Sequence, residues 1–218
     1  MSRFADRAAT LRFLAEAKVL GLVRTGDPDE AIALGRALLA GGIKAVEVSF
    51  TTPEAERVIE TLVADGVGMI GAGTVLQPQQ AMGALAAGAR FLIAPSQPKH
   101  LVPYARDDGA VAIMGGLTPN EIVAAMEAGA DFVKIFPVRA VGGAAYVRDL
   151  RGPFPDLPVL VSGGVDHTNY QDFLAAGAAL VVMGSGFLPA ALLQARDWTG
   201  IARYVRETLY EASSVSNR

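Results

Sequence analysis

The segment EAGADFVKIFP at residues 127–137 decides the fold, because three other segments repeat its pattern of small residues and glycine followed by an apolar run. Each copy follows an alanine-rich stretch with helical character, and its glycine stands where a helix should stop. The copies recur at intervals of a little over forty residues, and such repetition indicates a repeating architecture. The other three are AGGIKAVEV (40–48), AAGARFLIAP (86–95) and AAGAALVVMG (175–184).

Shorter apolar runs between these segments complete a set of eight strands, spaced about twenty to twenty-five residues apart. They are VLGLVR from Val19, GMIGAGT from Gly68, AVAIMGG from Ala110 and LPVLVSGG from Leu157. Eight βα units predict a closed (β/α)8 TIM barrel, with an open sheet of fewer strands as the alternative. We expect residues 1–218 to form one barrel domain. Ser2–Lys18 should add a helix before the first strand, and Trp198–Ala212 should form an amphipathic helix at the end.

The composition excludes several functional classes. The hydrophobic share is 51%, the aromatic share only 7% and the net charge −3. This favours parallel strands buried on both faces, and it offers no basic surface for nucleic acid or for an anionic membrane. Without cysteine there is no disulfide, thiolate metal site or cysteine nucleophile, and two histidines are too few for most metal sites. With no apolar window long enough for a membrane span, we expect a soluble cytoplasmic enzyme without metal or cofactor.

Two charged residues lie inside apolar strands: Glu47 in KAVEVSF and Lys134 in DFVKIFP. Strand alternation puts Lys134 on the same face as Phe132 and Phe136. A charge that points into a barrel is costly unless it is paired. The residues alone leave two interpretations: a structural ion pair, or an amine nucleophile beside a carboxylate that moves protons. Burial favours the neutral form of an amine, and the neutral amine attacks carbonyl carbons.

Glycines follow the seventh and eighth strands, at the end of the barrel where the βα loops build active sites. Gly163 and Gly164 end the seventh strand, and Gly184 and Ser185 end the eighth. Many barrels bind phosphate there, through backbone N–H groups and a nearby helix N-terminus. Tight turns are the alternative for either pair. Together, in a barrel with a buried lysine, they favour a phosphate site.

The run Gly71–Thr74 resembles the start of a dinucleotide-binding fingerprint, but Leu76 stands where its third glycine should be. A Rossmann site is therefore excluded. We expect a glycine turn whose N–H groups, with the Thr74 hydroxyl, bind a carboxylate. Farther along, Asp166 or Thr168 should cap the helix after the seventh strand.

The motifs EVSFTTP, GAGTV, IAPS, FVKIFP, SGGV and MGSG occur in the order and spacing of a known family. Over residues 18–212 the chain resembles the 2-keto-3-deoxy-6-phosphogluconate (KDPG) and 4-hydroxy-2-oxoglutarate (KHG) aldolases. The resemblance implies a metal-independent class I aldolase, usually a homotrimer, with Lys134 as the Schiff-base lysine and Glu47 as the general acid/base. The resemblance, together with the ends of the seventh and eighth strands, gives the expected substrate-binding residues. They are Arg24, Thr74, Pro95, Phe136, Ser162, Gly163, Gly164, Gly184 and Ser185.

The implied reaction is the reversible cleavage of a 2-keto-3-deoxy-6-phospho sugar acid to pyruvate and glyceraldehyde 3-phosphate. Alternatives in the family are the galactonate epimer and hydroxy-oxoglutarate. From other classes, a sugar-phosphate isomerase or epimerase, or a barrel that binds sugar phosphates without turnover, stays open. The chain departs from common family residues at Thr51, Ala94, Met114 and Ser162. Thr51 and Ser162 lie where the distal part of the sugar acid should sit, so they leave the substrate's identity open.

Overall fold

The computed structural model describes residues 6–215, with the side chains of Ser185 and residues 210–215 left out of the description. Eight parallel strands form a closed barrel in sequence order, and β1 pairs with β8 to close it, so the predicted (β/α)8 fold is confirmed. The strands are β1 (Val19–Val23), β2 (Ala45–Ser49), β3 (Met69–Gly73), β4 (Phe91–Ile93), β5 (Val111–Gly115), β6 (Phe132–Ile135), β7 (Val159–Val161) and β8 (Leu180–Met183).

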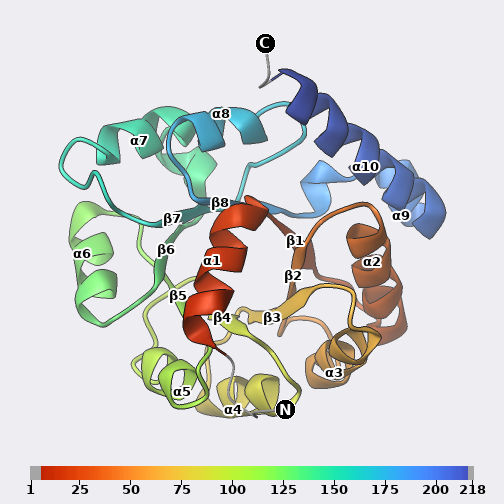
Figure 1. The fold of residues 1–218 in the computed structure, drawn as a ribbon, viewed down its shortest axis with the longest axis horizontal. Coiled ribbons are helices and arrows are strands. Elements are labelled where there is room, and N and C mark those ends of the chain that lie inside the picture. Colours follow the sequence, from red (N-terminus) through yellow and green to blue (C-terminus); the bar gives the residue numbers. More distant parts are fainter. Residues whose placement is uncertain (1–5, 216–218) are drawn as a thin grey trace.

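A ring of helices surrounds the strands (Figure 1). Their starts follow ordinary capping rules: α6, for example, has Thr118 as N-cap, Pro119 in its first turn and a capping box with Glu121. The helices are α1 (Arg7–Ala17), α2 (Pro28–Ala40), α3 (Ala55–Asp65), α4 (Pro78–Ala86), α5 (Leu101–Asp107), α6 (Pro119–Glu127), α7 (Gly143–Leu150), α8 (Tyr170–Ala175), α9 (Ala190–Gln194) and α10 (Trp198–Val215), with short 3-10 helices η1 (Val138–Val141) and η2 (Ser185–Phe187). No helix within residues 6–215 is both long and apolar enough to cross a membrane.

Helix α1 lies across the barrel and covers the amino-terminal ends of the strands (Figure 1). Its Leu14 is fully buried. It packs with interior side chains near the amino-terminal ends of the strands, such as Phe91 and Phe132. Arg7 forms an ion pair with Asp131, the residue just before β6. The expected N-terminal helix is thus confirmed from Arg7 to Ala17, while residues 2–5 of that prediction lie outside the described residues. The predicted C-terminal helix is confirmed as α10.

The barrel interior has an apolar layer and, closer to the carboxyl ends of the strands, a polar layer. The apolar layer is a cluster of mostly aliphatic side chains, and the outward faces of the strands pack under the helices in a second, larger cluster. Nearer the carboxyl ends, the interior positions carry Glu47, Ser49, Lys134 and Ser162, all buried. The apolar layer comprises Leu20, Ala45, Phe91, Ile93, Val111, Ile113, Phe132, Leu160, Leu180 and Val182. The polar residues therefore sit where the fold places active sites.

The prediction that Gly71 and Gly73 form a turn is wrong, because both glycines lie within β3. A Cβ atom at Gly71 would overlap the ring of Phe91 on the neighbouring strand. A Cβ atom at Gly73 would lie 2.9 Å from Oε2 of Glu47. Both glycines thus leave room inside the barrel for a larger side chain, and the turn starts only at Thr74.

The predicted cap of the helix after the seventh strand is also wrong, because α8 starts later than expected, with Asn169 at its N-cap. Asp166 instead accepts hydrogen bonds from the backbone N–H of Thr168 (2.8 Å) and from its hydroxyl (2.6 Å). These two bonds lower the pKa of Asp166. The carboxylate therefore orders the loop before α8 rather than the helix itself.

Substituting Gly71→Ala should destabilise the barrel, because the added methyl group meets the fully buried ring of Phe91. We expect a loss of about 1–3 kcal/mol in the free energy of unfolding. Combining it with Phe91→Leu should cost less than the sum of the two single changes, measured by denaturant unfolding in a double-mutant cycle. Gly26→Ala is the control, since a Cβ atom there meets nothing within 4 Å. Additive costs would show that Gly71 does not make room for the ring.

Candidate active site

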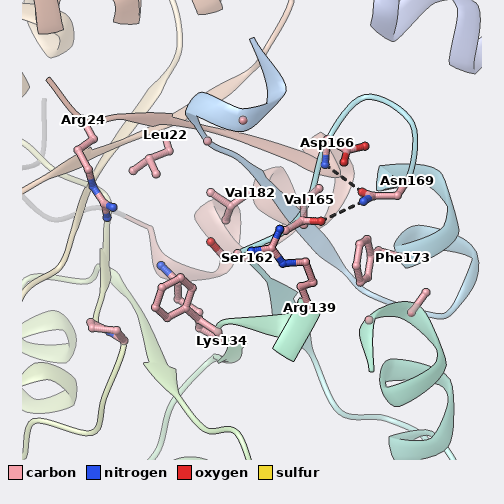
Figure 2. A pocket seen from close by; sticks show the side chains of 18 of the residues that line it. Leu22, Arg24, Lys134, Arg139, Ser162, Val165, Asp166, Asn169, Phe173 and Val182 are labelled. Carbon is pink, nitrogen blue, oxygen red and sulfur yellow. Dashed lines mark hydrogen bonds between the residues drawn. The ribbon is translucent and has the colours of Figure 1, made fainter. Parts of the chain in front are cut away.

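A cavity of about 950 Å³ opens at the carboxyl ends of the strands, and side chains from several strands and loops point into it (Figure 2). Glu47 lies below its surface, in contact with Lys134. The side chain of Ser185 is outside the described residues. Of the residues predicted for the site, the cavity is lined by Arg24, Thr74, Pro95, Lys134, Phe136, Ser162, Gly163, Gly164 and Gly184.

Lys134 and Glu47 meet inside the barrel although their strands, β6 and β2, are not neighbours. Nζ of Lys134 lies 3.8 Å from Oε1 of Glu47, and the side chains are only 8% and 1% exposed. The distance is in the range of an ion pair but longer than a hydrogen bond. Oε2 of Glu47 is buried without a hydrogen-bond partner among the described residues. Oε2 lies next to Gly73 in the barrel wall, so Oε1 is the carboxylate oxygen that faces the amine.

Phe136 and Pro95 border the amine from the ends of β6 and β4. The ring centroid of Phe136 lies 5.7 Å from Nζ of Lys134, within cation–π range. Phe136 is 42% exposed, so part of its side chain is open to the cavity. Both residues give the cavity apolar surface next to the lysine.

Thr74 has a strained backbone at the end of β3, with φ at 59°. A β-branched residue is rare in this left-handed region, and holding it there costs about 1–3 kcal/mol. The hydroxyl oxygens of Thr74 and Ser49 are 3.0 Å apart, and those of Ser49 and Thr51 are 2.8 Å apart. The strain fixes one end of a chain of three hydroxyl groups along the wall, where it can contact a polar ligand.

Gly163 and Gly164 follow β7 with φ values of 81° and 99°, where an L side chain is strained. Their carbonyl oxygens accept hydrogen bonds from the backbone N–H of Arg139 (3.1 Å) and from Nδ2 of Asn169 (2.9 Å). Their own N–H groups donate to no residue in the part of the chain that the structure describes. Because both glycines line the cavity, these N–H groups are available to an anion.

Sequence reasoning missed Arg139 and Asn169, which also line the cavity. Arg139 lies in η1, directly after β6, and Asn169 precedes α8. The prediction covered the strand ends, whereas these side chains come from the loops beyond them. A basic residue in the loop after the strand with the buried lysine was the signal that could have found Arg139.

The two histidines lie outside this cavity. The ring of His100 meets Tyr104 edge to face at 6.2 Å, and that of His167 meets Tyr204 at 6.3 Å. Among the described residues, no group of three or more His, Cys, Asp or Glu side chains is arranged to hold a metal ion.

The family model for KDPG and KHG aldolases matches residues 11–204. The chain is 34% identical over 184 residues to the KHG/KDPG aldolase of Escherichia coli K12, covering 83% of this chain and 85% of that one. It is 33% identical over 195 residues to the 2-dehydro-3-deoxy-phosphogluconate aldolase of Pseudomonas aeruginosa, covering 89% of each.

A similar solved structure is the KDPG aldolase of Legionella pneumophila, with pyruvate captured at low pH as a covalent carbinolamine intermediate. It superposes with a TM-score of 0.81 at 30% identity, covering 91% of this chain and 97% of that one.

At residue 74 a glycine variant should be more stable than an alanine variant, which is the reverse of the usual order. Glycine accepts a φ of 59° without strain whereas alanine does not, so Thr74→Gly should be more stable than Thr74→Ala by roughly 0.5–1 kcal/mol. At Thr61, inside α3, the alanine variant should be more stable by about 1 kcal/mol. Denaturant unfolding of the four variants measures both orders. The same order at both positions would show that Thr74 stores no backbone strain.

Proposed function

Because this chain belongs to the KDPG and KHG aldolase family, we propose that it is a class I aldolase that cleaves a 2-keto-3-deoxy-6-phospho sugar acid, reversibly, to pyruvate and glyceraldehyde 3-phosphate. The buried pair of Lys134 and Glu47, whose Nζ and Oε1 atoms lie 3.8 Å apart inside the barrel, carries the proposal. Family membership also decides against the isomerase and the non-catalytic binding protein that the sequence left open.

The reaction starts when the neutral amine of Lys134 adds to the C2 ketone of the substrate, giving a carbinolamine that loses water to form an iminium ion. The captured carbinolamine of the Legionella enzyme supports such an addition step. The iminium ion then accepts the electron pair of the C3–C4 bond as that bond breaks. The products of this step are the aldehyde and an enamine that still holds the three carbons of pyruvate.

Glu47 moves the protons. Its carboxylate, directly or through a water molecule, takes the proton of the C4 hydroxyl as the C3–C4 bond breaks, and the aldehyde leaves. The same group returns a proton to C3 of the enamine, and hydrolysis of the resulting iminium ion releases pyruvate and the free amine. Oε1 faces the amine to which the substrate becomes attached, so it is the oxygen placed for these transfers.

The other residues bind the two ends of the substrate. Thr74 binds the carboxylate of the keto acid through its fixed hydroxyl, and Pro95 and Phe136 cover the chain of carbon atoms. The N–H groups of Gly163 and Gly164 bind the phosphate. Also assigned to the phosphate end are Arg24, Ser162, Gly184 and Ser185.

We propose three further properties of the protein. The first is one barrel domain over residues 1–218, and the second is the cytoplasm as the compartment. The third is a homotrimer, as the family resemblance implies. Exposed apolar side chains on and near α4 and α6 are available for subunit contacts: Leu76, Met82, Val123 and Met126.

Covalent chemistry at Lys134 is tested by reduction with borohydride in the presence of pyruvate. We expect one pyruvate-derived mass on the peptide that contains Lys134. Lys134→Arg should be unlabelled and inactive, because a guanidinium stays protonated and forms no imine. An unmodified peptide, or a label on Lys18, Lys44 or Lys99, would falsify the assignment.

The role of Glu47 is tested by Glu47→Gln, which keeps the shape of the side chain but cannot accept a proton. The Schiff base with pyruvate should still be trapped. Exchange of the methyl protons of pyruvate with deuterium from solvent, followed by NMR, should slow by about a hundred- to ten-thousandfold. Glu60→Gln, on the exposed side of α3, is the control. Normal exchange in Glu47→Gln would make Glu47 a structural partner of the lysine only.

A further inference from the structure

We propose that Arg139 is a specificity-determining residue: its guanidinium binds the terminal phosphate of the substrate from the wall opposite Arg24. The inference rests on the proposed aldolase function and adds a second cation to the phosphate end of that site. It assigns the preference for a phosphorylated substrate to a residue in the loop between β6 and α7.

The backbone of η1 is held against the glycine loop after β7. The N–H of Val138 donates to the carbonyl oxygen of Ser162 (2.9 Å), and the N–H of Arg139 donates to that of Gly163 (3.1 Å). These bonds join η1 to the residues that offer free N–H groups. The backbone of Arg139 therefore lies beside the proposed anion site.

The stem of the Arg139 side chain runs over Gly164. A Cβ atom at Gly164 would lie 2.5 Å from Cβ of Arg139, 3.1 Å from Cδ and 3.2 Å from Cγ. The absence of a side chain at residue 164 thus gives the arginine its path. Figure 2 shows Arg139 extending into the cavity toward Ser162, while Arg24 enters from the other side. The guanidinium therefore reaches the space next to the N–H groups of Gly163 and Gly164.

Two cations of the cavity wall are free to bind an anion at this place. Lys134 is paired with Glu47, but the guanidinium groups of Arg24 and Arg139 form no ion pair or hydrogen bond with any residue that the structure describes. Two acids also line the cavity. The hydrogen bonds from Thr168 and the dipole of α8 keep Asp166 and Asp172 ionised. The inference therefore rests on the place of Arg139 beside the glycine N–H groups and not on the net charge of the cavity.

A phosphate monoester suits these groups better than a carboxylate does. It carries up to two negative charges and three acceptor oxygens, enough for two guanidinium groups and two backbone N–H donors at once. A carboxylate has one charge and two oxygens, and a terminal hydroxymethyl group has no charge at all. The pair of arginines thus selects for the phosphorylated end of the substrate.

The test compares kcat/KM for a 6-phosphorylated 2-keto-3-deoxy sugar acid with that for its unphosphorylated analogue. Arg139→Met keeps an apolar stem over Gly164 but removes the charge. The ratio of the two kcat/KM values should fall by about ten- to a hundredfold, since a hydrogen bond to a charged group contributes that much to binding. Arg139→Lys should give an intermediate ratio, because it keeps the charge without the planar fork.

A second measurement uses inorganic phosphate as the probe. Its inhibition constant should rise about tenfold or more in Arg139→Met and stay unchanged in Arg148→Met, which removes an arginine from the exposed side of α7. An unchanged ratio together with an unchanged inhibition constant in Arg139→Met would overturn the inference. In that case, normal trapping of pyruvate by borohydride would leave the aldolase function standing. If the wild-type protein neither traps pyruvate nor cleaves either substrate, the proposed function fails and the inference fails with it.

Discussion

Lys134 and Glu47 carry opposite charges into the interior of a closed barrel, where water cannot hydrate them as it does at the surface. Removing one partner of such a buried pair typically costs about 3–5 kcal/mol, because the other charge is then left uncompensated. Their separation of 3.8 Å satisfies this demand without a direct hydrogen bond. The neighbouring residues accommodate the pair: Gly73 has no side chain because the carboxylate of Glu47 occupies that space.

The two ends of the barrel differ in the residues that they carry. At the amino end, Leu14 of α1 continues the apolar layer, and the ion pair of Arg7 with Asp131 fixes the helix over it. At the carboxyl end, the strained backbone at Thr74 and the left-handed glycines after β7 point polar groups into the cavity. Apolar packing dominates at the amino end and polar groups face the cavity at the carboxyl end, where active sites form in this fold.

The barrel and the meeting of Lys134 with Glu47 could be predicted from sequence, because strand spacing, alternation and a charge inside an apolar run are local signals. The function of Gly71 and Gly73 could not, since it depends on side chains that neighbouring strands bring to the same place. The place of Arg139 in the site could not be predicted for a similar reason. Its position depends on hydrogen bonds between η1 and the loop after β7, and no local sequence pattern encodes those bonds. The start of α8 differs from the prediction because Asp166 binds the N–H and hydroxyl of Thr168 and so orders a turn before the helix, which begins after Asn169.

The separation between the apolar layer and the cavity above it has a consequence for how such a protein changes over evolutionary time. Thr51, Ser162 and Arg139 lie above the apolar layer, so replacing them leaves the packing of that layer untouched. Changes at these three positions therefore act on the cavity and not on the apolar layer. A combinatorial library restricted to these three positions would explore new aldehydes and keto acids on a scaffold that remains folded.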